Sequence, residues 1–403
     1  MTDVLRRGRA SLAFGFFAQG VAFALLVTRI PAIQDRYGVS DALLPAYLAA
    51  VPVLAGVGSV GTEWLVRRGI RPSSVLRWSQ PVVLVALLGV GAGERAVELG
   101  VALAAFGLAV GALDASMNML GVSLQWSYGR SIMLGFHAAY SLGGIVGASL
   151  AWVGAHWDMA LVVAYGPVVV VLVPAALVGS RWYVDGGGGD GSGGGERDGV
   201  VFKALLPLCL VMAFAYIGDA TVSNWSAKYV EDVLGGSEQL ATVPYNVYMV
   251  TTLVGRAVGD LGVRRFGAVG VVRGGAVVAA VGFAVVAGAP GAWVGMVGFT
   301  FLGLGLCVIV PQTFAAAGRL FPGASDVAIA RLNIFNYVGF LVGAPLVGAL
   351  GDAWSYRGAM LVPMVLVLVT LVYARSFGGR TDRYGGGHEW PRTADVGRGS
   401  NGL

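Results

Sequence analysis

Residues 111–147 read GALDASMNMLGVSLQWSYGRSIMLGFHAAYSLGGIVG, a largely apolar stretch that carries Asp114, Asn118 and His137. It lies in two apolar segments that are joined by a short polar link at 125–130. With their flanking residues, both segments reach the roughly 20 residues that a helix needs to cross a bilayer. The first carries Asp114 and Asn118, one helical turn apart, and the second carries His137. Ionisable groups at membrane depth are costly, so they are functional-site hypotheses by default.

The composition of the whole chain agrees with a membrane environment. Its 403 residues are 56% hydrophobic and 12% charged, about half the charged fraction of a soluble domain. The net charge of +5 does not indicate a nucleic-acid partner, because the position of the charges matters more than their sum. Cys209 and Cys307 both lie in apolar segments, where we expect them to pack and not to form a metal site.

The predicted fold class is an all-α membrane protein with twelve transmembrane helices in two pseudo-symmetric six-helix bundles. We expect a cytoplasmic N-terminus (1–9), a first bundle (10–180), a flexible cytoplasmic linker (181–202), a second bundle (203–377) and a disordered cytoplasmic tail (378–403). The linker contains DGGGGDGSGGGERDG, a composition too rich in glycine to pack a core. The expected spans are 10–30, 42–66, 75–93, 96–124, 131–153, 159–179, 204–225, 240–262, 268–288, 293–317, 327–350 and 358–377.

The two halves repeat one another along the sequence. SLGGIVGA at 141–148 aligns with YVGFLVGA at 337–344 at an offset of 196 residues, and at that offset His137 falls on Asn333. Transporters built by duplication hold their substrate between the repeats. We therefore expect a site between the two bundles.

The basic residues predict the orientation in the membrane. With both termini inside, the inner segments hold 21 Lys and Arg residues and the outer segments hold 5. Such an excess marks the cytoplasmic side. We expect a multi-pass protein of a bacterial cytoplasmic membrane with both termini in the cytoplasm.

Twelve spans in two halves with a long middle loop resemble the major facilitator superfamily. Within it, GALDASMN (111–118), GFHAAYSLGG (135–144), TRIPAIQDR (28–36) and VGRAVGDLGVRRFG (254–267) are similar to a bacterial fucose-permease-like subgroup. The resemblance covers residues 10–377. It implies a secondary active transporter that works by alternating access.

The link after the second span departs from the family pattern. It reads GTEWLVRRGIR at 61–71, with Val66 or Arg67 where the family has an aspartate. This weakens the expectation of an inward-gate charge relay in the first half. The copy after the eighth span keeps RRFG, with Asp260 four residues before Arg264.

Asp114 is the first candidate for proton or substrate binding. It shares one helix face with Gly111 and Asn118. A carboxyl group away from water can take up a proton near neutral pH, which a proton-coupled carrier requires. The alternative is a structural hydrogen bond to another helix.

His137 is the second candidate, and Tyr140 lies one turn further along the same face. Imidazole titrates in the physiological range, so His137 can carry a proton or contact substrate. A packing role is the alternative.

Asp219 is an acidic residue well inside a span of the second half. Three readings remain open for it: it binds a cationic substrate, carries a proton, or pairs with Arg29. The amides of Gln19, Asn333 and Asn336 suit a hydroxylated or amide-bearing solute, or they tie helices together.

A second group of charges is expected to act in gating or structure. Arg256 and Asp260 are spaced as a helical i, i+4 pair, for which an ion pair or gate latch is favoured over substrate contact. Arg67 and Arg264 begin matching basic pairs at an offset of 197 residues.

These observations predict a proton-coupled transporter of a small organic solute. No nucleotide-binding loop is visible, so we expect a proton gradient and no cofactor. The partners expected are the substrate and the bilayer, with no nucleic acid, and the protein is expected to be a monomer. Two in-span aspartates and abundant aromatics also suit efflux of a cationic or amphipathic compound, and efflux is favoured because the fucose-permease likeness rests on fold similarity, which does not fix function. Sugar import with a proton and a non-transporting sensor are the alternatives. An enzyme is not expected, because neither His-Glu-x-x-His nor Gly-x-Ser-x-Gly occurs.

Overall fold

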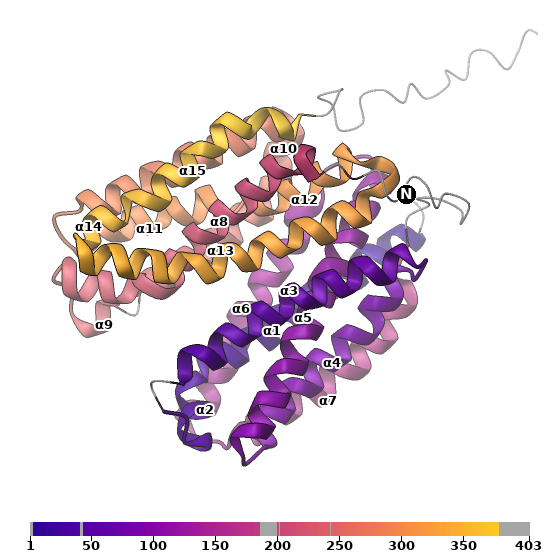
Figure 1. Ribbon diagram of the computed structural model, residues 1–403, viewed down its shortest axis with the longest axis horizontal. Helices are drawn as coiled ribbons and strands as arrows, with labels where there is room; N and C mark the ends of the chain where they lie inside the picture. The colour runs from indigo at the N-terminus through magenta and orange to yellow at the C-terminus, as the bar shows by residue number, and fades with distance from the viewer. Residues whose placement is uncertain (1–2, 41–42, 186–199, 201, 242, 379–403) are drawn as a thin grey trace, which may run out of the picture.

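The computed structural model describes residues 3–40, 43–185, 200, 202–241 and 243–378. These residues form two bundles of helices, the first in indigo to magenta and the second in pink to yellow (Figure 1). The glycine-rich part of the predicted linker (186–199) and the predicted tail from 379 lie outside the described residues.

Each bundle is built from long apolar helices with short helices at their ends. The first contains α1 (Asp3–Thr28), α2 (Ile30–Tyr37), α3 (Leu44–Arg67), α4 (Pro72–Ala92), α5 (Ala96–Tyr128), α6 (Met133–His156), α7 (Leu161–Gly179) and η1 (Ser180–Trp182). The second contains α8 (Phe202–Lys228), η2 (Tyr229–Val233), α9 (Glu238–Ala241), α10 (Val243–Gly288), α11 (Ala292–Leu306), α12 (Ile309–Leu320), η3 (Pro322–Ala324), α13 (Ser325–Ala353), α14 (Tyr356–Ala359), α15 (Leu361–Tyr373) and η4 (Ala374–Phe377).

Eleven helical segments of the described chain are long and apolar enough to cross a membrane, and α10 accounts for two crossings. A straight helix of its 46 residues would measure about 69 Å, twice the thickness of a bilayer core. At Gly267 the backbone leaves the helical region, with φ 75° and ψ 163°. A β-carbon at Gly262 would lie 3.6 Å from Val271, so the chain folds back on itself at this point. The predicted class, twelve crossings in an all-helical membrane protein, is confirmed.

The outer faces of the bundles are apolar. Val97 is 76% exposed, Trp293 75% and Val372 74%. Large apolar side chains without a protein partner belong in lipid, which covers them in a membrane protein. The chain is therefore a multi-pass membrane protein.

Paired glycines let the first and fifth long helices of each bundle approach closely. A β-carbon at Gly143 of α6 would overlap the backbone of Phe17 in α1. At the repeat offset, a β-carbon at Gly339 of α13 would overlap the backbone of Ala213 in α8. Small residues are the usual means of close helix packing in membranes. The aligned motifs therefore make equivalent contacts in the two halves.

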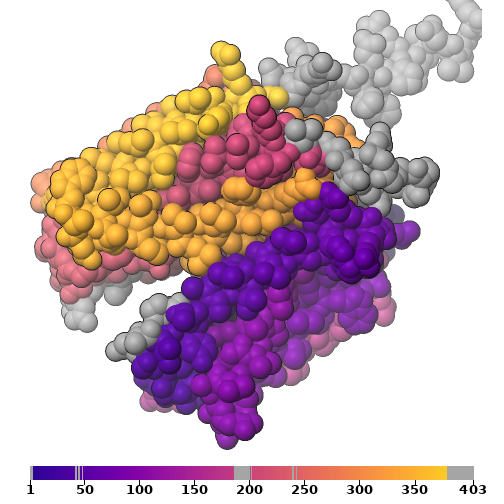
Figure 2. Space-filling view, in the orientation of Figure 1, coloured from indigo at the N-terminus to yellow at the C-terminus, as the bar shows by residue number. Residues whose placement is uncertain are grey.

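The bundles meet at one end and diverge at the other. The meeting end lies toward the N-terminus, where α3 packs on α13 and α6 packs on α10. Toward α2 and α9 the two bundles separate, as the space-filling view shows (Figure 2). The two bundles are thus in contact at the end of the molecule where the N-terminus lies, which we call the closed end. A cavity lies between the two bundles.

Candidate functional site

A cavity of about 880 Å³ lies between the two bundles and is lined by residues of both. Its walls are mostly apolar and aromatic, including Phe16, Phe23 and Phe340. Ligand sites typically combine such walls with a few placed polar groups. Eight of the residues predicted for substrate, proton or gating roles line it: Gln19, Asp114, Asn118, His137, Tyr140, Asp219, Arg256 and Asn336.

Asp114 links three helices and both halves of the molecule. Its carboxylate accepts a hydrogen bond from the Gln19 amide of α1. It also accepts one from the Tyr337 hydroxyl of α13, at 2.5 Å. Hydrogen bonds to an ionised group are stronger than neutral ones. The charge state of Asp114 therefore affects a bond that crosses between the halves.

Asn118 connects Asp114 to His137 through neutral hydrogen bonds. The Asn118 amide donates to the Asp114 carbonyl at 2.9 Å. The Asn118 Oδ1 lies 3.3 Å from the His137 Nε2. Because that oxygen only accepts, the contact favours the tautomer with the proton on Nε2. His137 also stacks on Phe314 of the second bundle, with ring centroids 6.2 Å apart. Asn118 therefore contacts the His137 ring and the backbone of Asp114, and the Asp114 carboxyl group has separate partners.

Asp219 and Arg29 do not pair, so the third reading for Asp219 was wrong. Asp219 of α8 accepts a hydrogen bond from the Tyr248 hydroxyl of α10. Arg29 is buried and donates to the carbonyls of Ala151 and Met159, both at 3.4 Å. Similar depth in the membrane does not bring two side chains together when they point to different helices.

Of the two alternatives for Arg256 and Asp260, the ion pair between them does not form, and both residues instead contact the first half near the start of α6 or along it. The Arg256 guanidinium donates to the Ser141 hydroxyl at 2.7 Å. The Asp260 carboxylate accepts from the Ser131 hydroxyl at 2.6 Å and from the backbone N–H of Gly135 at 2.9 Å. The first N–H groups of a helix lack partners and attract a negative charge. The start of α6 therefore takes the carboxylate that sequence spacing had assigned to Arg256.

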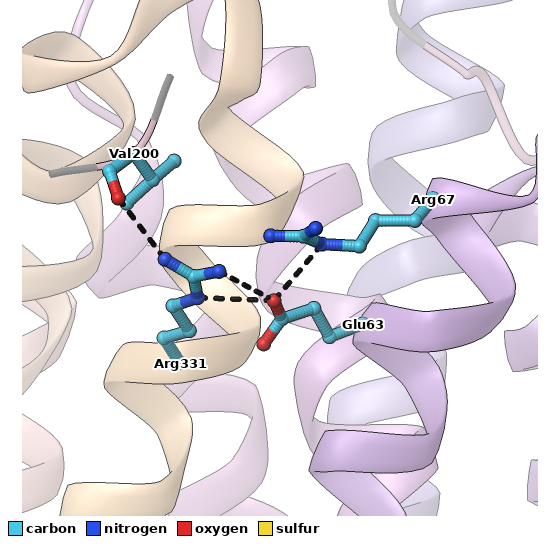
Figure 3. A network of polar contacts seen from close by, with 4 residues as sticks. All are labelled: Glu63, Arg67, Val200 and Arg331. Atoms are coloured by element: carbon cyan, nitrogen blue, oxygen red, sulfur yellow. Dashed lines mark hydrogen bonds and ion pairs between the residues drawn. The ribbon is translucent and has the colours of Figure 1, made fainter. Parts of the chain in front are cut away.

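A second contact between the two halves at the closed end is formed by the acidic side chain of Glu63 in α3 (Figure 3). Its Oε1 accepts from Arg67 Nε at 3.1 Å and pairs with Arg331 of α13, whose Nη2 lies 2.9 Å away. Arg331 also donates to the Val200 carbonyl at 3.1 Å. The first half therefore contributes a carboxylate to a charged contact at this end, although it lacks the aspartate of the family pattern.

Asn333 and Asn336 play different parts. The buried Asn333 donates to the Ser59 hydroxyl of α3 at 2.7 Å and is not part of the cavity wall. Asn336 donates to the Asn333 Oδ1 at 2.9 Å. Its own Oδ1 has no hydrogen-bond partner among the described residues. Arg264 donates to the backbone carbonyl of Asp260 at 3.1 Å, within its own helix.

Sequence reasoning missed the phenol groups that hold the two cavity aspartates. Neither Tyr337 nor Tyr248 was among the residues predicted for substrate or proton binding. Aromatic residues are common in membrane helices, so neither gave a distinguishing signal. The one sequence signal that could have pointed to Tyr248 is its spacing, because it lies eight residues before Arg256 on the same face of α10.

Comparisons with known proteins agree with this architecture. The profile of the Major Facilitator Superfamily matches residues 208–389. An uncharacterized MFS-type transporter of Yersinia pestis is 27% identical over 380 residues, which cover 91% of this chain and 95% of the relative. The transporter FucP in its outward conformation has a TM-score of 0.77 at 16% identity, covering 92% of this chain and 98% of FucP. A second FucP structure, described as the fucose:proton symporter of E. coli, has a TM-score of 0.71 at 15% identity over 92% and 98%.

Two helical bundles around a shared cavity are an architecture typical of secondary transporters, which move small molecules across a lipid bilayer. The chain is similar to the major facilitator superfamily in the matched part of its second half and in its fold, which supports the resemblance seen in the sequence. The family and its transporter relatives point to a transporter rather than an enzyme. The fucose-permease-like subgroup has only distant support, because the FucP likeness rests on the fold.

Proposed function

We propose that the protein is a proton-coupled secondary transporter of a small organic solute, with Asp114 as the proton-binding group. The observation that carries this proposal is the contact of Asp114 with Gln19 in its own half and Tyr337 in the other. A proton gradient supplies the energy, without a cofactor.

The coupling step follows from the charge on Asp114. An ionised carboxylate accepts strongly from both donors, and Tyr337 brings in the second bundle. Protonation removes the charge and weakens both hydrogen bonds, which loosens the link between the halves. One proton bound therefore changes the balance between the two arrangements of the bundles.

We propose that both termini face the cytoplasm of a bacterial cell membrane, in line with the excess of basic residues on that side. The cavity then opens to the exterior, where protons can reach Asp114. A monomer is sufficient, because residues of both bundles of one chain line the cavity.

Within this class we favour export in exchange for protons. The support is the combination of Asp114 and Asp219 with aromatic cavity walls, which suits a solute with a positive group and an apolar body. The second candidate is import of a sugar together with a proton, supported by the fold shared with FucP, a fucose:proton symporter.

A two-stage experiment separates these candidates. First, purified protein is screened by thermal shift against sugars, amines and secreted metabolites, since a bound ligand raises the apparent stability. The solute found is then added to inverted vesicles that report lumenal pH. Export by exchange makes the lumen more alkaline, whereas transport with a proton makes it more acidic. Solute uptake without any linked proton movement would disprove proton coupling.

A further inference from the structure

Arg256 makes no direct ion pair with a carboxylate among the described residues. Its guanidinium donates to the Ser141 hydroxyl at 2.7 Å and to the Cys307 carbonyl at 3.5 Å, both neutral acceptors. Asp260, one turn along α10, is held by the start of α6. A charged side chain at membrane depth is costly and usually marks a substrate path. The energetic cost of keeping this charge at membrane depth therefore indicates a functional role for Arg256.

The position of Arg256 gives it access to a ligand. It lines the cavity together with Tyr245, Met249 and Thr252 of the same helix. These four residues follow at i, i+4, i+7 and i+11, so they form one face of α10. A guanidinium presents several N–H donors in a planar fork that matches a carboxylate. The face thus offers a binding group for an organic anion.

The opposite charge lies further along the same wall. Asp219 lines the cavity and accepts from Tyr248, which is two helical turns from Arg256. The eight residues from Tyr248 to Arg256 correspond to about 12 Å along the axis of α10. Asp114 already has two donors, Gln19 and Tyr337. Arg256 and Asp219 therefore form a pair of opposite charges, separated along the cavity and summing to zero.

We infer that the substrate is a zwitterionic organic solute, whose anionic end binds Arg256 and whose cationic end binds Asp219. Its apolar body lies against the aromatic walls, among them Phe23 and Phe340. The inference rests on the proposed transport function and specifies the substrate class of that site. A solute with one charge satisfies only one of the two groups.

Three compounds with the same carbon chain test the inference: 6-aminohexanoate, hexanoate and hexylamine. Each is titrated at constant ionic strength into the purified full chain, and the shift in Tm is measured. We expect 6-aminohexanoate to stabilise the protein most. Arg256→Gln should weaken the apparent affinity for 6-aminohexanoate by about tenfold or more and abolish the effect of hexanoate. Asp219→Asn should weaken 6-aminohexanoate and hexylamine but leave hexanoate unchanged.

Ser141→Ala is the matched control, since it removes the acceptor of Arg256 on α6 but keeps the guanidinium. It should bind 6-aminohexanoate within about twofold of the unmodified protein. The inference is overturned if none of the compounds stabilises the protein, or if hexylamine matches 6-aminohexanoate. It is also overturned if Arg256→Gln binds normally, or if Ser141→Ala loses as much as Arg256→Gln. Binding is measured without a proton gradient, so proton movement that depends on Asp114 would still support the transport function after such a failure.

Discussion

Glu63 and Asp260 occupy equivalent places in the two halves, 197 residues apart, yet they close the molecule in different ways. Glu63 pairs with the guanidinium of Arg331 at the start of α13. Asp260 accepts from the backbone N–H of Gly135 at the start of α6. Gly135 and Arg331 are themselves 196 residues apart. The repeat thus preserves the place of the contact, an acid against the start of a helix in the other half, and changes its chemistry.

The difference in burial predicts which contact is stronger. The side chains of Glu63 and Arg331 are 15% and 24% exposed, and Arg67 beside them is 33% exposed. Asp260 is 5% exposed. Partly hydrated ion pairs contribute little and are screened by salt. A buried carboxylate on the N–H groups of a helix is screened much less. We therefore expect the α6–α10 contact to dominate closure of this end.

Replacing Asp260 should have the largest effect. Asp260→Ala leaves N–H groups of α6 unsatisfied and costs about 3 kcal/mol, which shifts the balance toward opening by about a hundredfold. The shift is measured as the distance between spin labels at the exposed positions 71 and 265, with Cys209 and Cys307 replaced by serine. Asp260→Asn should open the end less, because the amide oxygen still accepts. An unchanged label distance in Asp260→Ala would show that the α6–α10 contact does not dominate closure of this end.

The turn that follows each basic pair provides the next test. The first half turns at Gly69, φ 87°, and the second at Gly267, φ 75°. The backbone at Gly267 is accessible almost only to glycine, so Gly267→Ala should cost about 2 kcal/mol of stability. The loss is measured as a lower Tm. Gly274→Ala is the control, since it lies in regular helix with open space around it, and it should be neutral or stabilising. Equal effects of the two substitutions would contradict the assignment of the turn.

Glu63→Gln should have a smaller effect than Asp260→Ala. Removing a partly exposed ion pair costs about 1 kcal/mol or less after solvent screening. The distance between the labels at 71 and 265 should therefore change slightly. Raising the salt to about 1 M should reproduce this change in the unmodified protein and leave the Glu63→Gln variant unaffected. If salt changes the label distance in Glu63→Gln but not in a variant that lacks Asp260, the Asp260 contact is the salt-screened one and the ranking of the two contacts is reversed.

The smallest effect is expected from Ser59→Ala, which removes the acceptor of Asn333 between α3 and α13 and the donor to the Gly111 carbonyl of α5. Single hydrogen bonds between membrane helices average about 0.6 kcal/mol. The label distance should broaden without a shift of its centre. Ser149→Ala, which loses only a hydrogen bond within α6, should leave the distribution unchanged. If Ser59→Ala opens the end as widely as Asp260→Ala, the α3–α13 contact is the stronger one.

The sequence predicted the fold well because the relevant signals are local and strong. Apolar segments long enough to span a bilayer and the internal offset gave twelve crossings in two halves. The motifs aligned at the offset of 196 residues contain Gly143 and Gly339, and both glycines meet the backbone of a neighbouring helix. These features depend on composition and spacing, which a single chain displays directly.

Partners of the buried charges could not be predicted in the same way. Asp260 was assigned to Arg256 because four residues separate them, but the free N–H groups of α6 lie more than a hundred residues away in sequence. Pairing of Arg29 with Asp219 was one of three alternatives for Asp219, whereas Arg29 donates to carbonyls of its own bundle. Which helix a side chain faces depends on packing between helices, and the sequence does not specify it.

The central claim, that Asp114 couples proton movement to transport, is tested most directly by Asp114→Asn in inverted vesicles with a lumenal pH indicator. The solute identified by thermal shift is added, and proton movement is recorded beside solute uptake. Asp352→Asn, an exposed acid at the end of α13, serves as the control and should behave as the unmodified protein. We predict that Asp114→Asn inserts normally and loses proton movement linked to the solute. Normal coupled transport by Asp114→Asn across pH would contradict the account and make Asp114 a structural residue.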